Sequence, residues 1–231
     1  VNSYIQNGEI MKKRIGLCLS GCGMNDGSEI HESVITILAL DSLNIDIVYM
    51  APNITQKIVN NHLINNNSNE TRNVLTESAR ISRGNILDIV DINHDNLDAL
   101  IFPGGYGAVL NLCDFAQNGS SAKVQKDVFN LIASMINNNK PLGVICIAPA
   151  MLACVLRDLS LSAKLTIGND KDVAMQINNM GCKHIDCKVN DIVFDENLNI
   201  VSTPAYMLAE NISQAEIGIN KLVKKIVNII K

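Results

Sequence analysis

The apolar run at residues 141–150 constrains this chain more than any other feature. Its sequence is PLGVICIAPA, and the β-branched residues at its centre favour a strand that is buried on both faces of a sheet. Pro149 suits the first turn of a helix, where the backbone N–H that proline lacks is not needed. We therefore expect Cys146 at the C-terminal end of a strand, in a sharp turn that leads directly into a helix.

Cys146 at such a turn is a candidate nucleophile. The positive end of the following helix dipole favours a thiolate, so the sequence predicts a pKa below the free value of about 8.5. A cysteine at a buried strand end is otherwise an ordinary small core residue. The choice between these two interpretations therefore depends on the motifs around it.

The composition favours one α/β domain and excludes several classes of partner. A chain of 231 residues with 47% apolar content can bury a full core. The net charge is −4 and aromatic residues make up 3% of the chain, which argues against nucleic-acid binding. No apolar run approaches the roughly 18 residues of a membrane span, and residues 1–14 lack the apolar middle of a signal peptide. We expect a cytoplasmic protein without a membrane partner.

The cysteines do not form a recognisable framework. There are seven of them at irregular spacing, which is more typical of a reducing compartment than of a disulfide scaffold. Cys182, His184 and Cys187 lack the paired spacing of zinc ligands. The sequence thus predicts neither a metal nor another cofactor, and we expect His184 at the surface.

Strand and helix patterns alternate along the chain. This alternation predicts a three-layer sandwich, with helices on both faces of a mostly parallel central sheet. The strands are expected at 13–20, 44–50, 97–103 and 141–146, the helices at 30–43, 123–137 and from 212 onward, and an antiparallel pair at 191–195 and 199–203.

We expect a single domain over residues 13–231, preceded by a polar extension at 1–12 that is partly disordered. Residues 53–85 are long for a connection between strands, so we interpret them as an insertion with two helical pieces, the second at 71–80.

Three loops should meet beyond the C-terminal ends of the parallel strands, where ligands bind in open α/β sheets. The first loop follows Ser20, the second contains Gly104 and Gly105, and the third is the turn at Cys146. The backbone N–H groups of Gly104, Gly105 and Ile147 could form an oxyanion hole, in which each donor contributes about 3 kcal/mol.

The loop at 20–32 is rich in glycine but lacks the Gly-Lys-Ser/Thr ending of a phosphate loop. Asp26 and Glu29 have the spacing of a capping box, which gives Glu29 a structural role. Glu32 lies one turn further into the helix and is a candidate proton partner for the thiol. His31 points about 100° away from Glu32 and is expected at the surface or behind the site.

Six motifs together resemble the DJ-1/PfpI superfamily, which has a class I glutamine-amidotransferase-like, flavodoxin-like fold. Within it they resemble the ElbB-like branch, the glyoxalases named for isoprenoid biosynthesis. The motifs cover nearly the whole chain and are SGCG (20–23), DGSEIHE (26–32), ETRNVL (70–75), CIAPAML (146–152), LTIG (165–168) and TPAYMLA (203–209).

The resemblance implies a nucleophile at Cys146 and a proton-sharing carboxyl at Glu32, with Glu29 as the alternative. It implies a glutathione-independent glyoxalase, a lyase of the hydro-lyase type, which converts glyoxal or methylglyoxal to a hydroxy acid. Protein deglycase activity is the second activity attributed to the family. The resemblance also implies that the protein forms a homodimer. It implies that the substrate is a small aldehyde.

The chain departs from better-known members of the superfamily because Ile147, rather than a histidine, follows the cysteine. A Cys-His-acid triad is therefore not evident. Two other functions stay open: a non-enzymatic redox sensor or interaction protein, in which Cys22 resolves the oxidised thiol, and a glutaminase subunit, although residues 202–206 lack its late His-x-Glu. Further residues that could contact a substrate are Arg72, Asn111 and Tyr206.

Overall fold

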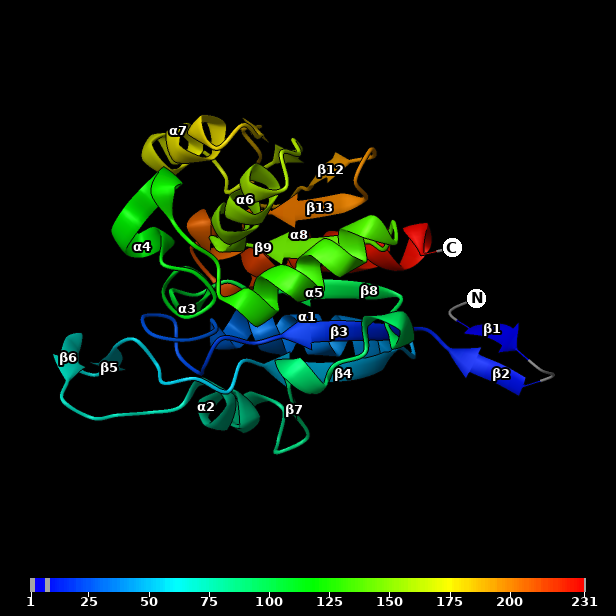
Figure 1. The fold of residues 1–231 in the computed structure, drawn as a ribbon, viewed down its shortest axis with the longest axis horizontal. Helices are drawn as coiled ribbons and strands as arrows, with labels where there is room; N and C mark the ends of the chain where they lie inside the picture. Colours follow the sequence, from blue (N-terminus) through cyan, green and yellow to red (C-terminus); the bar gives the residue numbers. More distant parts are fainter. Residues whose placement is uncertain (1–2, 7–8, 231) are drawn as a thin grey trace.

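A seven-stranded sheet forms the centre of the computed structural model, which describes residues 3–6 and 9–230 (Figure 1). The strand order is β12-β13-β9-β8-β3-β4-β7. Every neighbouring pair is parallel except β12 and β13, which run antiparallel. In chain order these strands are β3 (Arg14–Cys18), β4 (Asp46–Ala51), β7 (Leu87–Asp88), β8 (Ala99–Phe102), β9 (Leu142–Ile145), β12 (Val193–Asp195) and β13 (Ile200–Thr203).

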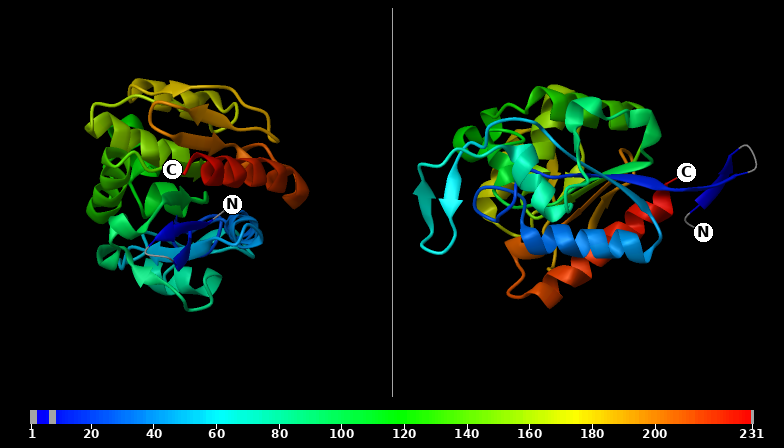
Figure 2. Two further views of the ribbon diagram at one scale, coloured as in Figure 1. Left: turned by 90° about the vertical axis from the view of Figure 1, so that its right-hand side faces the viewer. Right: turned by 90° about the horizontal axis from the view of Figure 1, so that it is seen from below.

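Helices cover both faces of this sheet, as the alternating pattern predicted. Helices α1 and α8 lie together on one face and α5 and α6 lie on the other (Figure 2). The α-helices are α1 (Ile30–Ser42), α2 (Val74–Ile81), α3 (Gly107–Leu110), α4 (Phe115–Asn118), α5 (Lys126–Asn137), α6 (Ala148–Asp158), α7 (Lys171–Asn179) and α8 (Ile212–Ile229). The short 3₁₀ turns are η1 (Ile89–Asp91), η2 (His94–Asn96), η3 (Gly119–Ser121) and η4 (Ala205–Met207).

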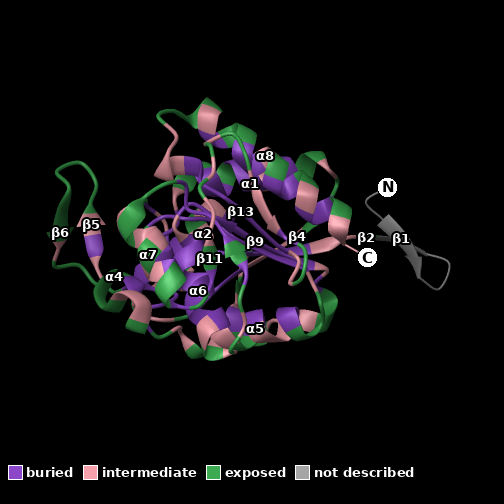
Figure 3. Ribbon diagram, turned by 90° about the horizontal axis from the view of Figure 1, so that it is seen from above, coloured by how far each residue is buried: buried purple, intermediate pink, exposed green. Residues whose placement is uncertain are grey.

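The middle strands are buried on both faces, as expected for parallel strands between two helical layers. All four residues of β8 and all four of β9 are buried (Figure 3). Leu40 of α1 and Leu222 of α8 share one core cluster, whereas Ile132 of α5 and Leu152 of α6 share the other. The two cores hold the sheet rigid beneath the loops that follow β3, β8 and β9.

The insertion at 53–85 differs from the prediction in its first half. Strands β5 (Val59–Asn61) and β6 (Asn66–Ser68) form an antiparallel hairpin in place of a helix, and α2 is the predicted second helical piece. The polar tract at 65–69 offers no apolar face for a helix to bury. Asn65 adopts the left-handed conformation at φ 47°, which asparagine tolerates in turns.

The two ends of the chain are also described in part. Strands β1 (Ser3–Gln6) and β2 (Glu9–Lys12) pair antiparallel in the extension at 1–12, while residues 1–2 and 7–8 of that extension lie outside the described residues. The predicted pairing of β12 with β13 and the C-terminal helix are both present.

A two-stranded parallel sheet joins β10 (Lys164–Leu165) to β11 (Lys183–His184). Within residues 3–6 and 9–230, none of the helices combines the length and hydrophobicity needed to span a bilayer.

Candidate active site

Cys146 occupies a strained turn between β9 and α6. Its φ of 62° lies in the left-handed region, which a residue with a side chain rarely adopts. The backbone N–H of Cys146 donates to the Thr203 carbonyl oxygen at 2.9 Å, which ties the turn to the end of β13. Such strain is typical of functional positions that the surrounding structure over-determines. The sequence predicted this turn and the helix that begins after it.

Two backbone donors face the Cys146 sulfur. The N–H groups of Gly105 and Ile147 donate to Sγ. The structure differs from the prediction for Gly104, because its N–H donates to Glu32 Oε2 at 2.9 Å and is therefore engaged. Gly105 and Ile147 are consequently the two donors placed near an oxyanion that forms on a carbonyl group attacked by this sulfur.

Glu32 is fully buried in the first turn of α1 and forms a hydrogen bond with the Cys146 side chain. Its Oε1 accepts the backbone N–H of Tyr206 at 3.1 Å. Burial, and then the negative charge of Glu29, raises the pKa of Glu32 from 4.5 to about 8, although the hydrogen bonds oppose this shift. Glu32 therefore carries a proton at neutral pH.

The thiol of Cys146 does not have the lowered pKa that the helix dipole predicted. Burial and the neighbouring Glu32 carboxyl raise the pKa of Cys146 well above its ordinary value, although the N–H groups of Gly105 and Ile147 act in the opposite direction. Desolvation thus outweighs the dipole, because the side chain is only 7% exposed. Cys146 and Glu32 form a buried pair that holds its protons at neutral pH.

The turn after β8 and the start of α1 hold each other in place. Glu29 donates its N–H to the Gly104 carbonyl oxygen at 2.9 Å. The predicted capping box is wrong, since Glu29 is itself the N-cap and accepts the Glu32 N–H on its own Oε2 at 2.7 Å. Asp26 instead accepts the backbone N–H of Asn60 at 2.7 Å. Glu29 keeps a structural role through this cap, and it also lines the cavity beside Cys146.

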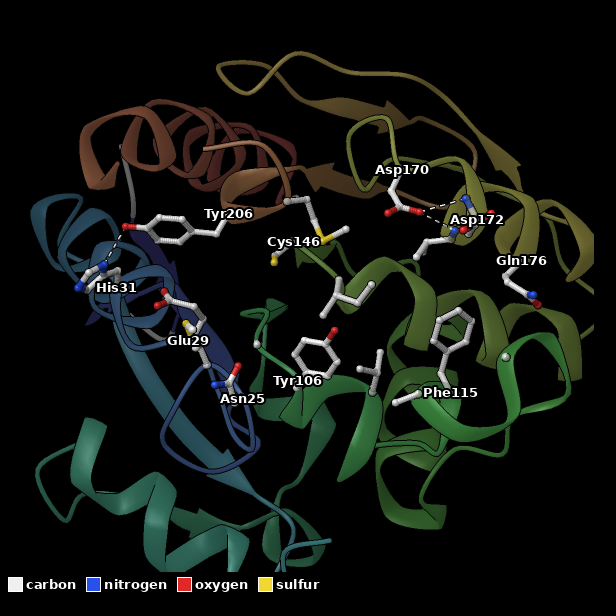
Figure 4. Close-up of a pocket in the computed structure, with 18 residues that line it drawn as sticks. Asn25, Glu29, His31, Tyr106, Phe115, Cys146, Asp170, Asp172, Gln176 and Tyr206 are labelled. Atoms are coloured by element: carbon white, nitrogen blue, oxygen red, sulfur yellow. Dashed lines mark hydrogen bonds between the residues drawn. The ribbon is translucent and has the colours of Figure 1, made fainter. Parts of the chain in front are cut away.

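His31 is exposed, as the sequence predicted, and it also lines the cavity. Its Nδ1 lies 2.8 Å from the hydroxyl oxygen of Tyr206, and both side chains line the cavity that contains Cys146 (Figure 4). The sequence signal was weak, because His31 is a neighbour of Glu32 on α1 and Tyr206 comes from a loop after β13. Only the fold brings them together.

The cavity at this site has a volume of about 760 Å³. Figure 4 shows Cys146 near its centre, with Glu29, His31 and Tyr206 on one side and Phe115, Asp172 and Gln176 on the other. Its remaining walls come from the loops after β3 and β8, from α3, α4 and α7, and from η4. The three loops predicted to converge therefore meet at this cavity.

The β5–β6 hairpin supports one wall of the cavity through Asn25. The N–H of Asn25 donates to His62 Nε2 at 3.3 Å, and its Nδ2 donates to Asn60 Oδ1 at 3.4 Å and to Asn65 Oδ1 at 3.0 Å. Asn25 and its neighbour Met24 line the cavity. Sequence reasoning missed this connection, because no pattern links the asparagine tract to the loop after β3.

Three of the predicted site residues lie elsewhere. Arg72 pairs with Glu70 at 2.7 Å and with Glu77 at 3.5 Å, and it does not line the cavity. Asn111 is buried among loops, where its Nδ2 donates to the carbonyl oxygens of Ser20 and Asp26 and its Oδ1 accepts the Lys57 N–H.

Cys22 is the third of these residues. It is half-buried in the loop after β3 and is not one of the residues that line the cavity around Cys146. His184 also differs from its expected surface position, because its side chain is 3% exposed and its Nε2 accepts the Ile167 N–H at 3.3 Å. Over residues 3–6 and 9–230, no three histidine, cysteine or acidic side chains gather in a way that could hold a metal ion.

Comparisons with known proteins identify the family. No family model matches the chain. The human protein named glutamine amidotransferase-like class 1 domain-containing protein 3, mitochondrial, is 37% identical over 226 residues, which cover 94% of this chain and 83% of that protein. The rat ES1 protein homolog, mitochondrial, is 35% identical over 94% of this chain and 84% of its own length.

Solved structures support the same assignment. An isoprenoid biosynthesis protein with an amidotransferase-like domain from Ehrlichia chaffeensis superposes with a TM-score of 0.89, at 36% identity, over 95% of this chain and 100% of that chain. Drosophila melanogaster DJ-1beta shares the fold alone, with a TM-score of 0.55 and 16% identity over 95% of this chain and 91% of that chain.

These comparisons correct one prediction and confirm another. The curated relatives are named as mitochondrial proteins, which contradicts the cytoplasmic location predicted from the sequence, and that prediction is withdrawn. The resemblance to the DJ-1/PfpI superfamily and its ElbB-like branch is confirmed. The chain belongs to the family of glutamine amidotransferase-like class 1 and ES1 proteins, which has the fold of the DJ-1/PfpI superfamily.

Proposed function

We propose that this protein is a glutathione-independent glyoxalase that converts small α-oxoaldehydes, such as glyoxal and methylglyoxal, to hydroxy acids. The observation that carries the proposal is the hydrogen-bonded pair of Cys146 and Glu32 beneath the cavity, with two backbone N–H donors on the sulfur. A nucleophile, a proton carrier and an oxyanion site are the groups that such a reaction needs.

The first step is addition of the thiol to the aldehyde. Glu32 in its carboxylate form takes the proton of the Cys146 thiol while the sulfur bonds to the aldehyde carbon. The aldehyde oxygen becomes an alkoxide, which the N–H groups of Gly105 and Ile147 stabilise until Glu32 returns the proton to it. The product of this step is a hemithioacetal, and Glu32 is again a carboxylate.

The second step moves a hydrogen between the two carbons of the substrate. Glu32 removes the proton from the carbon that carries sulfur and delivers it to the neighbouring carbon through an enediol. One carbon is thereby oxidised to a thioester and the other is reduced to an alcohol, so no external oxidant is required. Water then hydrolyses the thioester, which releases the hydroxy acid and restores the thiol of Cys146.

The second carbonyl oxygen of the substrate has a partner in Tyr206. Tyr206 lines the cavity and its hydroxyl lies 2.8 Å from His31 Nδ1 (Figure 4); we propose that this hydroxyl donates to that oxygen as the enediol forms while His31 holds the ring in place. Because the backbone N–H of Tyr206 also donates to Glu32, the same residue connects both ends of the reacting group.

The two alternative functions have less support at this site. A redox sensor needs an accessible thiolate, whereas burial raises the pKa of the Cys146 thiol. A glutaminase must hold the carboxylate of its amino-acid substrate, and none of the described residues that line the cavity is a lysine or an arginine. The relatives' names refer to amidotransferases by likeness, and the one basic side chain among the described lining residues is His31, which contacts Tyr206.

The deciding experiment is glycolate formation from glyoxal in the absence of glutathione. We expect the unaltered protein to form glycolate, Cys146→Ala to form none, and Cys22→Ala to keep the activity, because Cys22 does not line the cavity. The absence of glycolate with all three proteins would refute the proposal. Activity that survives in Cys146→Ala would refute the role of this thiol.

A further inference from the structure

The cavity is much larger than the two aldehydes that the proposed reaction requires. Its volume of about 760 Å³ falls in the range of roughly 300–1,000 Å³ that is typical of sites for drug-sized ligands. Glyoxal and methylglyoxal would occupy a small part of this space beside the sulfur. The rest of the cavity is therefore available for a larger substituent on the reacting carbonyl.

The space beyond the sulfur is bounded mainly by apolar side chains. Val109 of α3, Phe115 and Ala116 of α4 and Val173 of α7 line this part. Figure 4 shows Phe115 on the side of Cys146 away from Glu29 and His31, where Asp170, Asp172 and Gln176 also lie, so polar groups border the apolar part on this side. A ligand that reaches both Cys146 and the apolar part needs a carbonyl at one end and an apolar body at the other.

Carboxyl groups outnumber basic groups around the cavity. Glu29, Asp170 and Asp172 contribute three carboxyl groups, whereas the imidazole of His31 is the one basic side chain, and no lysine or arginine is present, among the described lining residues. Asp170 is engaged as the N-cap of α7, where it accepts the N–H groups of Asp172 and Val173. Asp172 lies at the exposed rim. This distribution favours a neutral or cationic ligand and disfavours an anion.

We infer that the natural substrate class is an α-oxoaldehyde with an apolar body the size of an aromatic ring or a branched alkyl group and without negative charge. This inference rests on the proposed function for the carbonyl chemistry. The part of the inference that concerns the apolar body and the absence of negative charge depends only on the shape and charge of the cavity. The apolar body lies against Val109, Phe115 and Val173, and the dicarbonyl end lies between Cys146 and Tyr206.

A binding series tests the cavity without chemistry. Cys146→Ala protein is titrated by calorimetry with benzyl alcohol, benzylamine and benzoate, which share a ring and differ in charge. We expect the alcohol and the amine to bind and benzoate to bind up to about fivefold more weakly, which is the upper range for an exposed charge. Asp172→Asn in the same background should reduce the advantage of the amine over the alcohol, whereas Asp91→Asn, an exposed aspartate outside the cavity, should not.

A kinetic series tests the apolar part in the active protein. The ratio kcat/KM is compared for glyoxal and phenylglyoxal, with mass spectra to confirm that phenylglyoxal has not modified arginines. We expect phenylglyoxal to be preferred by about tenfold, as for additional apolar contact in a fitted pocket. Ala116→Trp should abolish this preference, while Gln117→Trp on the same helix should leave it unchanged, because Gln117 does not line the cavity.

The outcomes separate this inference from the proposed function. If glyoxal is converted but the ring compounds neither bind nor react preferentially, the inference is wrong and the glyoxalase function stands. If the ring compounds bind in the expected order while neither aldehyde is converted, the glyoxalase function is wrong and the apolar, anion-rejecting character of the cavity stands. Equal binding of benzoate and benzyl alcohol would overturn the charge argument.

Discussion

Gly104 donates its backbone N–H to Glu32 Oε2 at 2.9 Å, across 72 positions of sequence. The same glycine accepts the N–H of Glu29 on its carbonyl oxygen, so both sides of one peptide segment are bound to the first turn of α1. The Glu32 carboxyl is thereby held against Cys146 by backbone groups whose positions the sheet determines. The reactive pair is set by the fold before any substrate arrives.

Substitution of Gly104 should disable the site. A Cβ at this position would press on Cys146 Cβ and lie 2.6 Å from Glu32 Oε2 and 2.9 Å from Cys146 Sγ. We expect Gly104→Ala to lose glycolate formation and to lower the free energy of unfolding by about 1–3 kcal/mol through overpacking. Gly181→Ala is the control for activity, because its Cβ would meet no atom within 4 Å; since its φ of 87° is strained for alanine, we expect it to lose some stability but to keep glycolate formation. Activity retained in Gly104→Ala would contradict this account of the site.

The activity should rise with pH through the ionisation of Glu32. The pKa of this group is raised to about 8, mainly by burial, and the proposed first step requires its carboxylate form. We therefore expect kcat/KM for glyoxal to increase from pH 6 and to level off above about pH 8. Glu32→Gln should lower kcat/KM by about 10²–10⁴-fold and remove the rise. A profile of the same shape in Glu32→Gln would assign the ionisation to another group.

The stability of the protein should fall over the same pH range. Glu32 has a pKa of about 8 in the folded protein and near 4.5 when exposed, so the folded state retains a proton that the unfolded state has released between these values. The free energy of unfolding therefore decreases as pH rises from about 4.5 to about 8, by at most about 1.4 kcal/mol per pH unit for one group. Urea unfolding at pH 5, 6.5 and 8 should show a smaller decrease for Glu32→Gln than for the unaltered protein. Parallel pH dependences for the two proteins would show that Glu32 is not the group responsible.

Loss of the Tyr206 hydroxyl should impair the reaction without disturbing the Cys146–Glu32 pair. Tyr206→Phe keeps the backbone N–H that donates to Glu32 and removes the oxygen that contacts His31. We expect kcat/KM to fall about tenfold, as for one hydrogen bond to the reacting group, with the midpoint of the pH profile unchanged. Tyr49→Phe removes a hydroxyl on β4, outside the residues that line the cavity, and should have little effect. An equal loss in both variants would point to a general change in the protein.

The sheet and the turn at Cys146 could be predicted because their signals are local. The run at 141–150 specifies a buried strand and a helix start, and Gly104 and Gly105 mark the end of β8 in the same way. The convergence of these loops then follows from parallel topology, since strands in one sheet place their C-terminal ends on one edge. Glu32 could be placed near the thiol for the same reason.

The remaining features depend on tertiary contacts that leave no local pattern. Arg72 and Asn111 have residue types suited to a substrate, but Arg72 pairs with acidic residues on its own segment and Asn111 holds loops together. The raised pKa of Cys146 depends on its burial and on Glu32, neither of which the helix-dipole argument includes. The contact between His31 and Tyr206 could not be predicted, because Tyr206 lies 175 positions further along the chain.

Because Asn25 contacts the β5–β6 hairpin, the shape of the cavity wall and the position of the reacting groups depend on different parts of the fold. Cys146 and Glu32 are fixed by the sheet and by α1, whereas the wall at Met24 and Asn25 is supported by an appendage that projects from the body of the fold (Figure 1). Changes in the hairpin's length or sequence can thus reshape what enters the cavity while the reacting groups stay in place. In this protein the choice of ligand and the reaction therefore depend on different segments of the chain.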